Sequence, residues 1–284
     1  MNPVFGKKLI SSLLENNCQF VESYGAGNVN KKLALIPVVA ILLVLASMLD
    51  LGLKGKYVFN SPYLLLILTF VFYWLVTPVV AYISAKGYLT TGSLTLLFVS
   101  LAFFVGVPFS IATGITAVSS PNETVTLGAL GFLVSSAFQF LGAAQASFGS
   151  VQVGSEGRKR RLMIAFTGVS AISGLIILLD LLGRFPAFFV ENSGVKLVDL
   201  VVYGFVILFF IVGGLLYLRL YFRAKTDILY TYSLALMLYG IGSFGITQQL
   251  VFGDAVVWVG RIATYIGLLY FLFALIGGRQ ENGS

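Results

Sequence analysis

The last long apolar stretch of the chain reads AVVWVGRIATYIGLLYFLFALIG and runs from Ala255 to Gly277. A helix needs about 20 mainly apolar residues to cross a bilayer, so this stretch predicts a membrane-spanning helix. Arg261 is the only Lys or Arg well inside any apolar segment of the chain. It follows Asp254 by seven residues, which at helical rise is a depth of about 10 Å. A guanidinium at that depth costs roughly 3 kcal/mol on insertion scales, so we expect it to face protein, to find a partner or to extend toward the interface.

The composition of the whole chain predicts the same class of protein. The 284 residues are 58% hydrophobic and only 10% charged, whereas a soluble domain carries about 25% charged residues. Apolar runs recur along nearly the whole length, and they are too long for the strands of a β-barrel. We therefore expect an all-α integral membrane protein.

Eight apolar segments predict eight transmembrane helices in one compact bundle, with short connections and antiparallel neighbours. The expected spans are residues 33–53, 62–85, 89–117, 124–150, 161–183, 197–219, 228–250 and 255–277.

The distribution of Lys and Arg predicts the orientation. With the N-terminus inside, 13 of the 18 basic residues fall in inner segments and four in outer loops, and Arg261 is the last one. This excess follows the positive-inside rule and places both termini in the cytoplasm. The outer four are Lys54, Lys56, Arg184 and Lys196.

Two short segments flank the bundle, which covers residues 33–277. Residues 1–32 lack the apolar core and cleavage site of a signal peptide. Phe5, Leu9, Leu13 and Phe20 recur near helical spacing, which favours an amphipathic helix on the inner membrane face over a frayed tail. Residues 278–284 form a cytoplasmic stub.

Several kinds of chemistry lose support from the composition. Cys18 is the only cysteine and the chain has no histidine, which disfavours disulfides, zinc, haem and histidine-dependent hydrolysis. The net charge of +7 is spread over short loops, so it indicates orientation in a lipid bilayer and not binding of nucleic acid. We expect no cofactor, no metal and no catalytic residue.

Polar groups within the spans are the candidate site residues. Asp50, Asp180, Asp199, Arg261 and Gln248 all fall toward the outer side under this topology. One interpretation is a water-accessible outer cavity in which a ligand competes for a carboxylate–Arg261 pair, and Asp180 is the favoured partner. The other is that these groups reach the interface or form a fixed pair that locks helices together.

Gln139 is a further candidate, near the middle of the fourth span. An amide in hydrocarbon requires a partner across a helix interface. The alternatives are a hydrogen bond between helices and a ligand contact.

Four short stretches resemble the multi-span input regions of prokaryotic membrane sensor histidine kinases. The resemblance covers roughly residues 60–277 and rests on Lys86-Gly-Tyr-Leu-Thr-Thr-Gly-Ser93, Pro121-Asn-Glu-Thr-Val-Thr126, Tyr232-Ser-Leu-Ala-Leu236 and Trp258-Val-Gly-Arg261 to Tyr265. Members of that family tend to carry histidines around the fourth span, where this chain has Gly128 and Gln139.

The resemblance implies a sensory module in the plasma membrane that relays an outer or bilayer cue to a cytoplasmic partner, or to a PAS or kinase module beyond Ser284. A homodimer is a further expected arrangement. The alternative is a transporter or channel for a small solute or ion, because buried Asp and Arg groups are usual in such pathways. An intramembrane enzyme is the least favoured hypothesis, because only isolated Asp, Ser and Tyr side chains remain for chemistry.

Overall fold

The computed structural model describes residues 31–280 except for 60, 150 and 192. The proposed amphipathic helix in residues 1–30 and the end of the stub, residues 281–284, lie outside the described residues. Within the described part, eight helical segments are long and apolar enough to cross a membrane, which confirms the all-α bundle. They are α2 (Lys31–Asp50), the continuous segment α3 (Pro62–Thr69), η1 (Phe70–Val76) and α4 (Thr77–Thr91), then α5 (Leu94–Thr116), α6 (Pro121–Phe148), α7 (Arg158–Leu181), α8 (Leu197–Ala224), α9 (Asp227–Thr247) and α10 (Ala255–Gln280).

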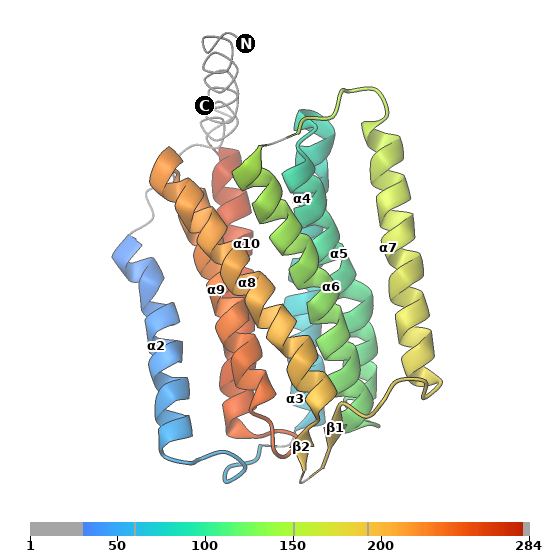
Figure 1. Ribbon diagram of the computed structural model, residues 1–284, viewed down its shortest axis with the longest axis vertical. Coiled ribbons are helices and arrows are strands. Elements are labelled where there is room, and N and C mark those ends of the chain that lie inside the picture. Colours follow the sequence, from blue (N-terminus) through green and yellow to red (C-terminus); the bar gives the residue numbers. More distant parts are fainter. Residues whose placement is uncertain (1–30, 60, 150, 192, 281–284) are drawn as a thin grey trace, which may run out of the picture.

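The helices stand roughly side by side, and successive ones run in opposite directions (Figure 1). α9 packs against α10, α8 and α2, while α5 packs against α6, α4 and α7. Contacts of α6 with α8 and of α4 with α10 join these two groups. α2 and α7 therefore lie at opposite edges of the bundle, and both leave much of their apolar surface uncovered.

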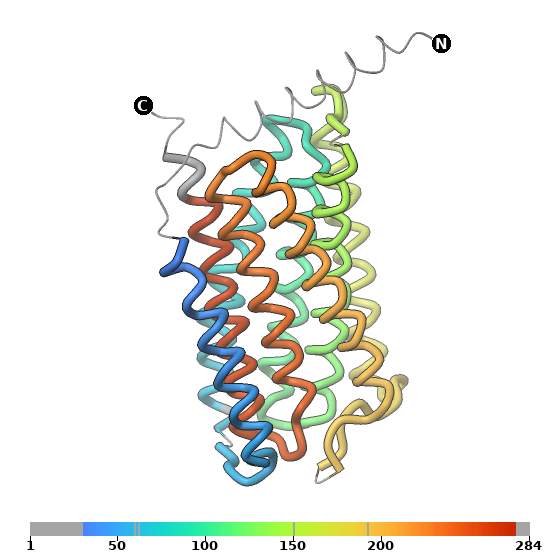
Figure 2. Tube along the Cα trace, turned by 60° about the vertical axis from the view of Figure 1, so that its left-hand side comes forward, coloured from blue at the N-terminus to red at the C-terminus, as the bar shows by residue number. Residues whose placement is uncertain are grey.

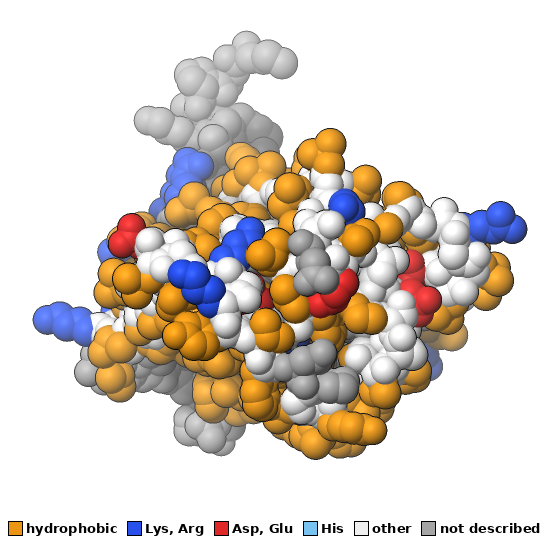
Figure 3. Space-filling view, turned by 90° about the horizontal axis from the view of Figure 1, so that it is seen from below, with side chains coloured by type: hydrophobic (Ala, Val, Ile, Leu, Met, Phe, Trp, Pro, Cys, Tyr) orange, Lys and Arg blue, Asp and Glu red, His pale blue; other side chains and the backbone are white. Residues whose placement is uncertain are grey.

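The two described chain ends lie at the same end of the bundle, as an even number of antiparallel helices requires (Figure 2). At that end the Lys31 ammonium lies 3.0 Å from the Asp227 carboxylate. The opposite end carries a two-stranded hairpin of β1 (Phe189–Val190) and β2 (Gly194–Val195). We call it the hairpin end, and Figure 3 shows basic and acidic side chains among apolar ones on its surface.

The expected boundary between the second and third spans was displaced. The structure continues α4 to Thr91 and starts α5 at Leu94, where the sequence pattern suggested an end near residue 85 and a start near 89. Gly92 adopts the left-handed conformation with φ of 76° and ends α4, because glycine has no Cβ to oppose it. The last turns of α4 contain the polar residues Lys86, Thr90 and Thr91. The apolar run in the sequence therefore ends before the helix does.

Small residues bring α9 and α10 into close contact. A methyl group on Gly242 would lie 2.6 Å from the carbonyl oxygen of Gly260, and one on Gly245 would lie 2.9 Å from the Gly260 Cα. Such approach allows backbone packing where apolar burial gives no driving force between helices in lipid.

The second span contains a feature that the sequence analysis did not predict. Its central seven residues, Phe70–Val76, form a π-helix between α3 and α4. π-helical turns are rare and occur often at functional sites. This segment faces α5 and α10 near the middle of the bundle.

Candidate functional site

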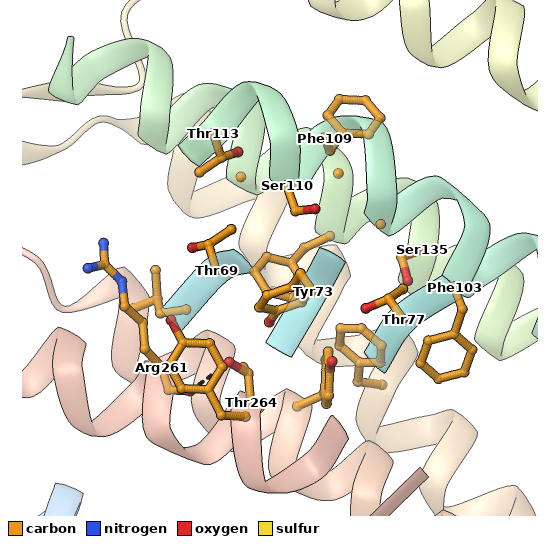
Figure 4. A pocket seen from close by; sticks show the side chains of 18 of the residues that line it. Thr69, Tyr73, Thr77, Phe103, Phe109, Ser110, Thr113, Ser135, Arg261 and Thr264 are labelled. Carbon is orange, nitrogen blue, oxygen red and sulfur yellow. Dashed lines mark hydrogen bonds between the residues drawn. The ribbon is translucent and has the colours of Figure 1, made fainter. Parts of the chain in front are cut away.

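A cavity of about 120 Å³ lies inside the bundle. It runs from Gln249 and Arg261 near the hairpin end to Gln139 and Phe271 in the middle, and every helix except α2 and α7 contributes to its wall. Figure 4 shows Arg261 at one end, Phe103 at the other and Tyr73 of η1 between them. Its hydroxyl groups include those of Thr69, Thr77, Ser110, Thr113, Ser135 and Thr264. The volume is similar to that of the apolar protein cavity of about 150 Å³ that admits benzene.

Arg261 is the only charged residue among those that line the cavity. Its guanidinium carbon lies 5.1 Å from the centroid of the Trp258 ring and 5.7 Å from that of Phe252. Contact with an aromatic face attracts a cation, most strongly where water is excluded. The titratable side chains close to Arg261 are those of Tyr265, Tyr203 and Tyr73, which are uncharged phenols at neutral pH.

Hydrogen bonds hold the Trp258 ring and the backbone of Phe252 in place beside Arg261. The Trp258 indole N–H donates to the carbonyl of Phe59 at 2.9 Å. The backbone N–H of Phe252 is 3.4 Å from a carboxylate oxygen of Glu191 in the hairpin connection. Three segments far apart in sequence thus fix the position of this cation.

The favoured pair between Asp180 and Arg261 does not form. Among the described residues the only ion pair is that of Lys31 with Asp227, at the opposite end. Asp180 lies on α7, which packs mainly against α5, α6 and α4. One of its carboxylate oxygens is buried without a hydrogen-bond partner in the described part of the chain, and the nearby carboxyl group is that of Glu123. Because α7 lies at the edge of the bundle, Asp180 does not line the cavity with Arg261.

The other two candidate carboxylates are also outside the cavity wall. Asp50 is exposed at the end of α2. Asp199 is fully buried in the first turn of α8, and neither of its carboxylate oxygens has a hydrogen-bond partner in the described part of the chain. Neither residue lines the cavity with Arg261.

Of the glutamines, the structure brings Gln139 to the inner end of the cavity. Its amide oxygen accepts a hydrogen bond of 2.7 Å from the Tyr232 hydroxyl of α9, so the expected bond between helices is present. Gln248 instead bonds Thr247 and does not line the cavity. Its neighbour Gln249 does, with 1% of its surface exposed and its amide nitrogen without a partner among the described residues.

The sequence analysis missed Tyr73, which the π-helix places at the centre of the cavity wall (Figure 4). Its hydroxyl interacts with those of Thr264 and Tyr239, and its ring packs edge-on against Tyr265 with centroids 6.0 Å apart. The dense aromatic run from Phe70 to Trp74 was the available signal, since such bulk within a span requires an unusual environment.

Chemically, the cavity wall offers hydroxyls, two amides and one cation. The lining includes no carboxylate, among the residues that the structure describes, and the chain has no histidine. Such a wall suits recognition of a ligand by hydrogen bonds and one charge, surrounded by apolar contacts.

Comparison with known proteins found no matching family model, no matching curated protein and no matching solved structure. The molecule is thus defined by its own architecture: a bundle with eight helices of membrane-spanning length and composition in its described part, and an internal, hydroxyl-lined cavity with one arginine.

Proposed function

We propose that this protein is a multi-pass sensory module of the plasma membrane, which binds a small molecule in the cavity and relays its presence to a cytoplasmic partner or output module. The observation that carries the proposal is the cavity itself, which combines a fixed cation, amides and hydroxyls inside an otherwise apolar bundle. Concave sites with a few oriented polar groups are the usual form of a small-molecule site.

The apolar surface of the helix bundle supports the proposal that the protein lies within a lipid bilayer. Large apolar side chains are exposed along α2 and α7, such as Leu43, Ile164 and Leu175. A water-soluble molecule rarely exposes contiguous apolar surface of this extent. The basic excess at the end away from the hairpin favours the cytoplasm for that end.

The contact between α9 and α10 supports the relay. Arg261, Thr264 and Tyr265 on α10 line the cavity, and α10 continues from there to the opposite end of the bundle. Because α10 meets α9 through backbone contact at Gly242 and Gly260, the two helices respond to the cavity as one unit. Their far ends are where a partner would detect the change.

The test uses a side chain that fills the cavity. Gly128 lines it, and a Cβ there meets nothing within 4 Å, so Gly128→Leu occupies the space without a backbone clash. Gly204→Leu, on the exposed face of α8, is the matched control because a Cβ there is equally free. Spin labels on Thr90→Cys and Ile276→Cys in a Cys18→Ser background report the distance between the far ends of α4 and α10.

The distance distribution is measured by double electron–electron resonance. We expect Gly128→Leu to shift it, as a bound molecule would, and Gly204→Leu to leave it unchanged. Identical distributions in all three proteins would show that the cavity and the far end are uncoupled, and the sensory proposal would be wrong.

A transporter is the second candidate, and the π-helix favours it. The π-helix is a stretch of irregular helical backbone beside the cavity, and in transport sites irregular backbone lines the pathway. Uptake of radiolabelled acetate, glycine or glucose into proteoliposomes, abolished by Gly128→Leu and retained in Gly204→Leu, would favour transport over sensing.

A further inference from the structure

We propose that the cavity takes a small monoanion, namely a carboxylate on a short aromatic body, with the carboxylate at Arg261 and Gln249. This inference rests on the proposed function, since it specifies the ligand of the same cavity.

The charge of the cavity is the first reason. Arg261 has no ion-pair partner among the described residues, and the titratable side chains close to it are uncharged phenols. The carboxylates expected to neutralise it, Asp180 and Asp199, are absent from the cavity wall. Arg261 is partly buried, and a guanidinium within a membrane-spanning segment is costly without a counter-charge, so an anion that enters the cavity gains the interaction that the protein leaves open.

The geometry of the donors is the second reason. The rings of Trp258 and Phe252 lie close to the guanidinium, while its N–H groups make no hydrogen bond to a described residue. A planar guanidinium binds a planar carboxylate through two parallel hydrogen bonds. The buried amide nitrogen of Gln249, which also lines this cavity, provides an independent donor without a partner among the described residues.

The far part of the cavity is the third reason. Its lining includes the rings of Phe103, Phe132, Phe210 and Phe271. The volume of about 120 Å³ is on the scale of one aromatic ring. A single positive charge balances a carboxylate, whereas a phosphate monoester carries about −1.5 to −2 charges and would remain partly unneutralised.

The experiment compares phenylacetate with phenylacetamide, which has nearly the same shape and no charge. Binding to the full chain in nanodiscs is measured by ligand-observed NMR and by the rise in unfolding temperature. We expect phenylacetate to bind at least tenfold more tightly than phenylacetamide and than phenyl phosphate. Arg261→Gln is expected to remove this preference, and Arg261→Lys, which keeps the charge but not the fork of donors, to retain part of it.

The possible outcomes separate the two proposals. If the acid and the amide bind equally, and Gly128→Leu but not Gly204→Leu abolishes both, the cavity is a ligand site but the anion proposal is wrong. Tighter binding of phenyl phosphate also overturns the monoanion. If neither phenylacetate nor phenylacetamide binds, or if Gly128→Leu has no effect, both the ligand class and the cavity's role as a ligand site are rejected. The comparison of the acid with the amide on the unmodified chain holds even where an Arg261 variant fails to fold.

Discussion

At the scale of single residues, a buried hydrogen bond connects two helices of the bundle. The hydrogen bond from Tyr232 to Gln139 joins α9 to α6 at the inner end of the cavity, where both side chains are buried. Within lipid, hydrogen bonds between helices contribute about 0.6 kcal/mol on average, since the separated helices also find partners. The hydrogen bond from Tyr232 to Gln139 is 2.7 Å long and joins two buried groups, so we expect it to contribute more than this average.

Tyr232→Phe is therefore expected to destabilise the protein by about 1 kcal/mol, because it leaves the Gln139 oxygen without its donor. The measurement is the midpoint of unfolding in a series of SDS and mild-detergent mixtures. Tyr88→Phe is the matched control, since the Tyr88 hydroxyl is buried with no hydrogen-bond partner in the described part of the chain. Equal effects of the two changes would show that the Tyr232 bond contributes nothing.

At the scale of helices, the pair α9–α10 is the closest association that glycines create in the bundle. Its backbones meet at Gly242, Gly245 and Gly260, where even one methyl group would be too large. An added methyl must displace the facing backbone or distort the helix. In a packed interface this typically costs about 1–3 kcal/mol.

Gly242→Ala is thus expected to lower the stability by about 1–3 kcal/mol and to separate α9 from α10. Gly204→Ala, on an exposed face, is expected to be neutral or to stabilise by up to about 1 kcal/mol, because alanine favours helix over glycine. Both are measured by SDS-induced unfolding. A Gly242→Ala protein as stable as the Gly204→Ala control would contradict the close contact.

At the scale of the whole molecule, the charge distribution assigns a direction to the bundle. The hairpin end carries four basic residues in its loops, and the other end carries most of the rest. Because cytoplasmic loops are enriched in Lys and Arg, the hairpin is expected to face outward. The cavity would then extend inward from the outer side of the membrane.

Cysteine labelling tests this direction. In a Cys18→Ser background, Ser193→Cys in the hairpin is expected to react with a membrane-impermeant maleimide on intact cells. Glu156→Cys, exposed between α6 and α7, is expected to react only after permeabilisation. The reverse pattern would overturn the orientation and place the cavity on the cytoplasmic side.

The hydropathy pattern predicted most of the helices of the fold, because each span is specified by its own apolar run. The eight expected spans match the helices to within a few residues, and the largest displacement comes from the turn at Gly92. The π-helix was not predictable in this way, since Phe70–Val76 is apolar throughout and shows no change of period.

The site was predictable only in part, because depth along a helix says nothing about which helices are neighbours. Arg261 and Gln139 were expected and line the cavity, whereas Asp50, Asp180, Asp199 and Gln248 do not. Asp180 has a suitable depth but lies on the peripheral α7. Tyr73 emerged only once eight helical segments were packed together.

The contact between Trp258 and Arg261 has an optical consequence. The chain has two tryptophans, Trp74 in the π-helix and Trp258 beside the guanidinium. Indole emission depends on the charges near the ring, so any molecule that neutralises Arg261 must alter the fluorescence of Trp258. In a Trp74→Phe background this emission comes from one ring alone. The protein thereby carries a spectroscopic reporter at the one charged point of its interior cavity.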